Sequence, residues 1–164
     1  AAVAGLVGAT FSSGGAGART VGDRDHLPSP VQALKEAKLI LPYQPVIPAR
    51  IPGSLTMELA DYGDPREGSP TLDLWYTDAN GTLALHIWQT SLPPDALGPH
   101  DDPTRQGTPE LIDGKEWMLL RMDRGTWIDL GLSRRLDSGL LVSMDAVEGT
   151  EAAGALRQMA AELD

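Results

Sequence analysis

Few residues of this chain have side chains suited to catalysis or ligand recognition, and most of them lie in one predicted hairpin. Asp73 and Trp75 alternate with apolar residues in its first strand, and His86 and Trp88 do so in its second. Alternate residues of paired strands share a face, so we expect these four side chains to lie together, with Asp73 near His86. This pattern is compatible with acid–base chemistry at His86, but a buried, hydrogen-bonded histidine is its commoner outcome.

Tryptophan is unusually frequent, with four Trp against one Phe. All four, at positions 75, 88, 117 and 127, fall in predicted strands. A tryptophan on a sheet more often packs beneath a helix than lines a groove for a peptide, glycan or lipid. Trp75 and Trp88 share one face while Leu74 and Ile87 lie on the other, so both faces are apolar at this point. Either helices cover both faces, or one face is a binding surface.

Two acidic groups contain residue types that bind divalent metal ions, but neither has the ligand spacing of a known site. They are His100-Asp101-Asp102 and the set Asp61, Asp64 and Glu67. The sequence also lacks the motifs of serine hydrolases, zinc proteases and nucleotide-binding loops. We therefore predict no catalytic residue, no metal site and no cofactor. The candidate binding residues are Trp75, His86, Trp88 and His100.

The elements that would position these residues predict an α+β fold. Ser29, Pro30 and Gln32 form a helix-capping signal, and the first helix would carry Val31, Leu34 and Lys38 on one side. A final helix is expected at 150–163, with Thr150 as its cap. Between the helices we expect an antiparallel meander sheet of about five to six strands. The strand-like segments begin at Ser54 and continue at 71–77, 82–89, 110–112, 115–122, 126–132 and 140–144.

Turn residues punctuate this pattern. Asn80-Gly81 predicts a tight hairpin turn in which Gly81 takes a positive φ. The proline-rich segment 41–53 is expected to run as an extended lead-in along the domain surface, because prolines cannot donate to a central strand. The Pro- and Gly-rich segment 91–108 is predicted to be a long loop and the most mobile element.

Composition restricts the classes of partner. The 164 residues carry 13 Lys and Arg against 23 Asp and Glu, a net charge of −10. This balance disfavours nucleic acids and anionic lipid surfaces, which require positive charge. The absence of cysteine excludes disulfides and thiolate chemistry. The expected partner is an unidentified protein or small ligand.

The N-terminal residues differ in composition from the rest. Residues 1–9 are small and uncharged, and a Ser/Gly/Ala-rich run follows at 12–18. We interpret 1–27 as the remnant of a signal or membrane segment followed by a flexible tether, and 28–164 as a single globular α+β domain. An ordinary disordered terminus is the alternative.

Several segments resemble an extracytoplasmic domain family of unknown function from bacteria. Its members lie beyond the membrane helix of anti-sigma factors and in related lipoproteins. The resemblance covers about 41–163 and includes the proline-rich lead-in, the 71–89 hairpin, the Ile112-Asp113-Gly114 turn, the strand from Gly125 to Leu132, the Asp137-Ser138-Gly139 turn and the closing helix that ends at 160–163. It implies an extracytoplasmic location, with membrane attachment only through an upstream anchor.

Three functions are compatible with these features. The resemblance implies a non-enzymatic sensory or interaction domain of a membrane-anchored bacterial protein of the anti-sigma factor type. A secreted or lipoprotein module that binds a glycan, lipid or peptide through the tryptophan face is the first alternative. A small hydrolase or lyase that uses His86 or His100 is the second.

The tether interpretation predicts that residues 1–27 are dispensable for stability, because they offer almost no periodic apolar face. A chain that starts at Pro28 should show the same melting temperature as the full chain by circular dichroism. A loss of several degrees would show that the N-terminal segment packs on the domain.

Overall fold

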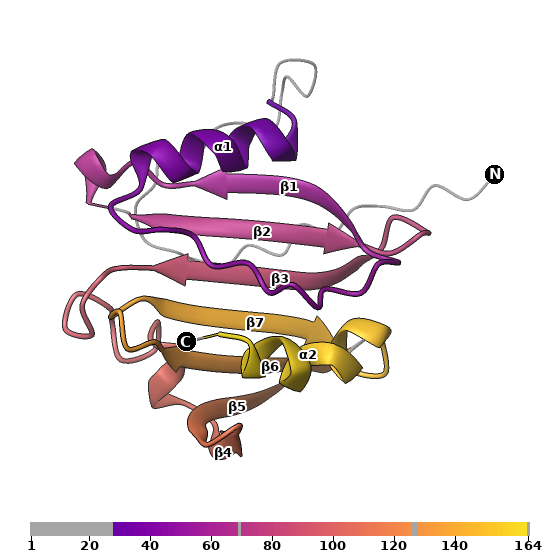
Figure 1. The fold of residues 1–164 in the computed structure, drawn as a ribbon. Coiled ribbons are helices and arrows are strands. Elements are labelled where there is room, and N and C mark those ends of the chain that lie inside the picture. The colour runs from indigo at the N-terminus through magenta and orange to yellow at the C-terminus, as the bar shows by residue number, and fades with distance from the viewer. Residues whose placement is uncertain (1–27, 69, 126–127, 164) are drawn as a thin grey trace.

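A computed structural model describes residues 28–68, 70–125 and 128–163, which form one sheet and two helices (Figure 1). The mixed α+β architecture with an N-terminal and a C-terminal helix is therefore confirmed. The helices are α1 (Pro30–Ile40) and α2 (Glu151–Ala161), and neither is long and apolar enough to span a membrane. The strands are β1 (Thr56–Tyr62), β2 (Thr71–Thr77), β3 (Leu83–Thr90), β4 (Thr108–Ile112), β5 (Lys115–Asp123), β6 (Ile128–Arg135) and β7 (Leu141–Val147).

The sheet differs from the predicted meander of five to six strands. It has seven antiparallel strands in the order β1-β2-β3-β7-β6-β5-β4 among the described residues (Figure 1). The first three strands form one meander and the last four form another, which starts at the opposite edge and returns so that β7 pairs with β3. Segment 91–107 makes the crossing between the edges, and it contains a short 3-10 helix at Pro103–Arg105. Local turn signals specify each hairpin but carry no information about which strands meet between the two meanders.

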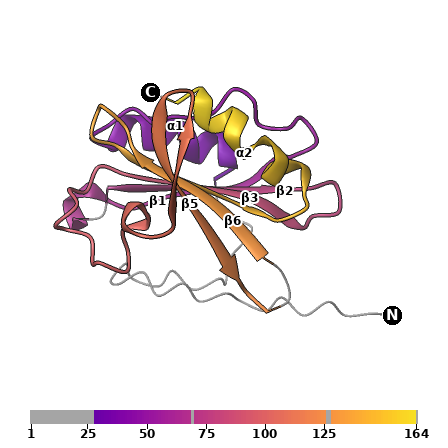
Figure 2. The same ribbon diagram turned by 90° about the horizontal axis from the view of Figure 1, so that it is seen from below.

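Both helices lie on the same face of the sheet (Figure 2). We call this the helix face; it carries the buried side chains of Leu72, Leu74, Leu85, Ile87 and Met144, each with no exposed surface. Segment 41–53 crosses the same face in front of β3 (Figure 1). It is fixed there by Gln89, whose side-chain oxygen accepts a hydrogen bond from the Val46 backbone at 3.0 Å. The predicted lead-in therefore completes the core between the two helices.

The caps of the helices follow the prediction, whereas the buried side of α1 does not. Ser29 accepts a hydrogen bond from the Gln32 backbone at 3.3 Å, and Thr150 accepts one from Ala153 at 3.2 Å. The residues of α1 that are buried are Ala33 and Ala37, while the predicted face residue Val31 is 61% exposed. Small side chains allow α1 to approach the sheet closely, so its contact face is a stripe of alanine.

An irregularity in β1 changes a second expected face. Leu55, Met57 and Leu59 alternate in the sequence, but the register with β2 shifts between Met57 and Leu59. A bulge of this kind inserts one residue and reverses the faces beyond it. Met57 therefore packs against the core, whereas Leu59 lies on the other face and is 41% exposed.

The β2–β3 turn is formed as predicted, with Gly81 at φ +75°. The Asp78 carbonyl accepts the Gly81 N–H at 3.0 Å, and the Asp78 carboxylate accepts the backbone N–H groups of Asn80 and Thr82. These donors lower the pKa of Asp78 below its usual value. The loop thus starts at Asp78, two residues before the predicted Asn80-Gly81 pair.

Two glycine-to-alanine substitutions should change stability in opposite directions. Gly81→Ala forces a side chain into the left-handed region and should lower the free energy of unfolding by about 1 kcal/mol. Gly154→Ala, within α2 and with no atom near the added Cβ, should raise it by about 0.5–1 kcal/mol. Urea denaturation of both variants measures the difference, and equal midpoints would contradict the turn geometry.

Candidate functional site

The register of β2 with β3 places Asp73, Trp75, His86 and Trp88 on the same face of the sheet, opposite the core. Trp75 pairs directly with His86, and Asp73 pairs with Trp88. All four side chains are partly buried. Neither described helix covers this face, which we call the open face (Figure 2). The predicted grouping is therefore confirmed, and the two described helices lie on only one of the two sheet faces.

His86 is held on three sides. Its ring stacks on Trp75 with centroids 3.7 Å apart and an angle of 12° between the ring planes. Its Nε2 lies 2.8 Å from Asp73 Oδ1, which confirms the expected histidine–carboxylate contact. Its Nδ1 lies 3.8 Å from Asp145 Oδ2. The imidazole therefore bridges two carboxylates from β2 and β7 while one ring face rests on an indole.

Asp145 also belongs to this site, although the sequence pattern did not indicate it. It pairs with His86 across β3 and β7 and with Gly131 across β7 and β6. A Cβ at position 131 would come within 2.4 Å of Asp145 Oδ1, so the glycine leaves the space that the carboxylate occupies. The sequence predicted that the last strand ends at Met144, and only the pairing of β7 with β3 brings Asp145 beside His86.

Removal of water raises the pKa of the Asp145 carboxyl from 3.8 to about 6. Asp129 on β6 adds to the increase, while His86 and Arg124 oppose it. The side chain keeps 27% of its surface exposed, compared with 30% for Asp73 and 20% for His86. All three groups are thus partly desolvated but still reachable from solvent.

The remaining sequence candidates lie elsewhere. His100 is exposed in the loop between β3 and β4, where its carbonyl accepts a hydrogen bond from Gln106. No contact joins it to His86 or the two tryptophans within the described residues. Trp117 is fully buried in the core. The expectation for Trp127 falls outside the described residues, as do those for 1–27.

The two acidic groups considered for metal binding are used in local turns. Asp102 is 1% exposed and accepts hydrogen bonds from the Thr104 backbone and hydroxyl at the start of the 3-10 helix. Asp64 accepts the Arg66 backbone N–H in the same way. Across the part of the chain that the structure describes, no three His, Asp or Glu side chains are grouped to hold a metal ion.

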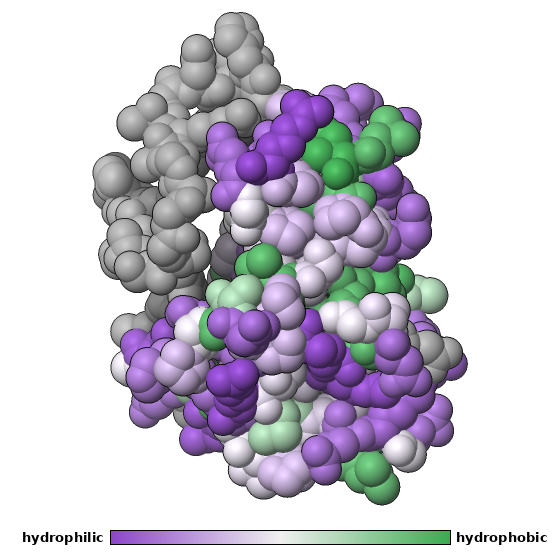
Figure 3. Space-filling model, turned by 90° about the vertical axis from the view of Figure 1, so that its left-hand side faces the viewer, coloured by the Kyte–Doolittle hydropathy of each residue, from purple (hydrophilic) through white to green (hydrophobic). Residues whose placement is uncertain are grey.

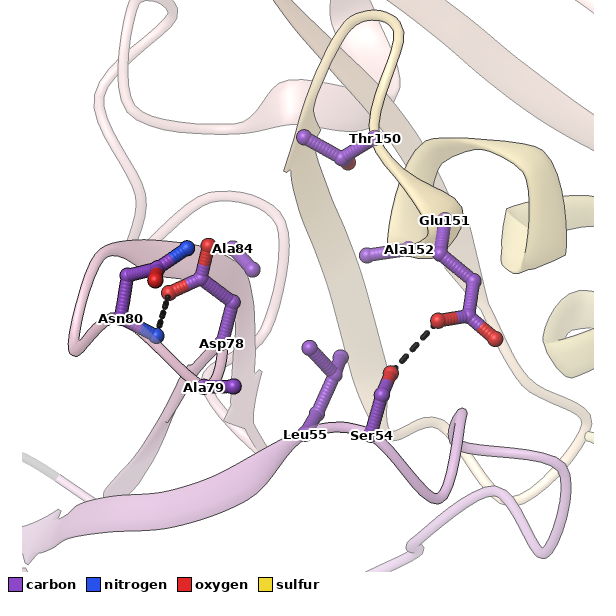
Figure 4. A pocket seen from close by; sticks show the side chains of 9 residues that line it. All are labelled: Ser54, Leu55, Asp78, Ala79, Asn80, Ala84, Thr150, Glu151 and Ala152. Carbon is purple, nitrogen blue, oxygen red and sulfur yellow. Dashed lines mark hydrogen bonds between the residues drawn. The ribbon is translucent and has the colours of Figure 1, made fainter.

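A hollow of about 320 Å³ lies between the β2–β3 turn and the start of α2 (Figure 4). Its polar groups already contact one another: Glu151 accepts the Ser54 hydroxyl at 2.5 Å, and Asp78 accepts the Asn80 backbone. Thr150 caps the helix above it. The hollow therefore offers no uncompensated group that would select a ligand.

Exposed hydrophobic residues also occur on α1. Leu39 is 86% and Ile40 is 47% exposed. Figure 3, which views the molecule from the left of Figure 1, shows hydrophobic side chains near its top, at the level of α1, among mostly hydrophilic ones. Nothing in the structure shows what would cover these aliphatic side chains. The open face is therefore the strongest candidate site.

Comparisons with known proteins found no match to this chain among family models, curated proteins or solved structures.

The environment of Asp145 predicts an unusual pH dependence of stability. Folding raises the pKa of the Asp145 carboxyl, so as the pH rises this group loses its proton in the unfolded chain before it does in the folded chain. This lowers the free energy of unfolding between pH 4 and 7 by about 2–3 kcal/mol. Asp145→Asn removes this effect, so the stability of the variant relative to the wild type should rise over the same interval.

Urea denaturation at both pH values measures this change. Asp113→Asn, which removes an exposed carboxylate from the β4–β5 turn and suits its φ of 48°, is the matched control. A relative stability of Asp145→Asn that does not vary with pH would show that the carboxyl is not perturbed.

Proposed function

We propose that this chain is a non-enzymatic binding module whose ligand or partner contacts the open face at Trp75, His86 and Trp88. The observation that carries the proposal is the position of these residues on the sheet face that no described helix covers. Aromatic side chains provide large contact areas at small entropic cost. Asp73 and Asp145 supply the polar groups that would orient a ligand.

The geometry of His86 argues against catalysis. A general base needs a ring nitrogen directed at the substrate, with the other nitrogen oriented by a partner. In His86 both nitrogens face carboxylates, and Trp75 covers one side of the ring. The hydroxyl of Ser143, two residues before Asp145 on β7, forms a buried hydrogen bond of 2.9 Å with the hydroxyl of Ser133. These contacts favour recognition over turnover.

The resemblance of segments 41–163 to bacterial extracytoplasmic domains supports a specific setting for this module. In that setting the domain senses a ligand or protein outside the cytoplasm and belongs to a membrane-anchored protein of the anti-sigma factor type. A secreted or lipoprotein module for a glycan, lipid or peptide would use the same face. Both functions depend on contact at the two tryptophans.

Two truncations separate a binding face from a second core layer. Leu74→Ala removes a side chain with no exposed surface and should cost about 2–5 kcal/mol of unfolding free energy. Trp88→Ala, on the open face, should cost clearly less, because its side chain is only partly buried. Equal losses in urea denaturation would show that the tryptophan face is structural.

Binding itself can be tested through the indole N–H signals of Trp75 and Trp88 in NMR spectra. The probes are a short peptide, a soluble oligosaccharide and a detergent micelle, each titrated into the full chain. At least one class should shift these two signals while leaving that of the buried Trp117 unchanged. No shift with any class, or turnover of a substrate that depends on His86 or His100, would contradict the proposal.

A further inference from the structure

We propose that the open face binds a cationic side chain, Arg or Lys, of a protein partner, held by Asp73 and Asp145 beside Trp75 and Trp88. This inference rests on the proposed binding function and specifies the chemistry of the partner. It follows from the charges, the aromatic groups and the partial exposure of side chains on one face of the sheet.

The open face is rich in carboxylates around His86. Asp73 lies on β2 and Asp145 on β7, and both contact the imidazole. Asp61 pairs with Asp73 from β1 and is exposed. On β6, Asp129 is paired with Arg124 at 3.0 Å. Among the described residues, these four carboxylates outnumber their two cationic partners, His86 and Arg124, in a chain whose net charge is −10.

The aromatic groups lie in the same rows of the sheet as these carboxylates. Cross-strand pairing gives one row of Trp75, His86, Asp145 and Gly131, and a second that contains Asp73 and Trp88. Arg and Lys bind best where an indole face adjoins a carboxylate, because cation–π attraction and an ion pair act together. His86 shows this arrangement within the chain, since it stacks on Trp75 and contacts Asp73.

The raised pKa of Asp145 indicates that His86 and Arg124 do not fully offset the desolvation of its carboxylate. Desolvation outweighs the attraction of His86 and Arg124, so the pKa of its carboxyl stays near 6. A further cation would stabilise the ionised carboxylate of Asp145, and it would bind more weakly when this carboxyl group is protonated. Because the side chain is 27% exposed, a partner group can reach it. Acidification should therefore release the partner.

The test uses two peptides that differ only in charge. The probe is acetyl-Gly-Arg-Gly-Arg-Gly-amide, and its control replaces each arginine by citrulline, which has nearly the same shape but no charge. Both are titrated into the full chain at low salt, with the indole signals of Trp75 and Trp88 as the readout. We expect the arginine peptide to bind at least about tenfold more tightly than the citrulline peptide.

Three carboxylate variants locate the binding. Asp73→Asn and Asp145→Asn should each weaken the arginine peptide about tenfold, whereas Asp113→Asn, with the same change in net charge, should not. Lowering the pH from about 7.5 to about 5.5 should weaken binding to the wild type at least about threefold, and much less to Asp145→Asn. Melting curves confirm that each variant is folded.

Equal binding of the two peptides, or equal effects of Asp145→Asn and Asp113→Asn, would overturn the inference. If an oligosaccharide or micelle shifts the indole signals and the arginine peptide does not, the proposed binding function stands and the cationic partner is wrong. Tighter peptide binding after the double substitution Arg19→Gln and Arg24→Gln would assign this face to the chain's own N-terminal segment and overturn an external partner.

Discussion

The antiparallel pairing of β3 with β7 is the contact on which the rest of this structure depends. It joins two separate meanders into one sheet through the register Leu85–Ala146, Ile87–Met144 and Gln89–Val142 on the helix face. The same pairing places α2, which follows β7, over the core beside segment 41–53. On the opposite face it brings Asp145 against His86. Core and candidate site are thus two sides of a single strand pairing.

The local features of the fold could be predicted because neighbouring residues determine them. Ser29 and Thr150 cap their helices, and Gly81 takes the positive φ that its turn requires. The features that could not be predicted depend on distant segments or on small register changes. The order of the strands depends on the β3–β7 pairing, which no local signal indicates. The bulge at Met57/Leu59 and the alanine contact face of α1 depend on packing against β2 and β1, which residue periodicity does not describe.

The candidate site was predictable to the same extent. Asp73, Trp75, His86 and Trp88 belong to one hairpin, so alternation alone placed them on one face. Asp145 and Gly131 come from the other meander. Asp145 lies one residue beyond the predicted strand 140–144, and a glycine in a strand-like segment does not indicate which side chain lies beside it. His100 was selected for its residue type within a loop, where no periodicity indicates direction. Residues that act together across a sheet can be recognised from sequence only when their hairpin contains all of them.

The arrangement around Asp145 is costly for a purely structural feature. A glycine within a strand loses about 0.5–1 kcal/mol of stability relative to alanine, and at Gly131 an added Cβ would meet the Asp145 carboxylate, which would have to shift. The raised pKa of Asp145 adds a cost at neutral pH. A serine, as in the Ser133–Ser143 pair two residues along β6 and β7, would fill the same position without either cost. Carboxyl groups with perturbed pKa values are concentrated at functional sites, so the environment of Asp145 is consistent with the proposed role of the Asp73–His86–Asp145 cluster in binding.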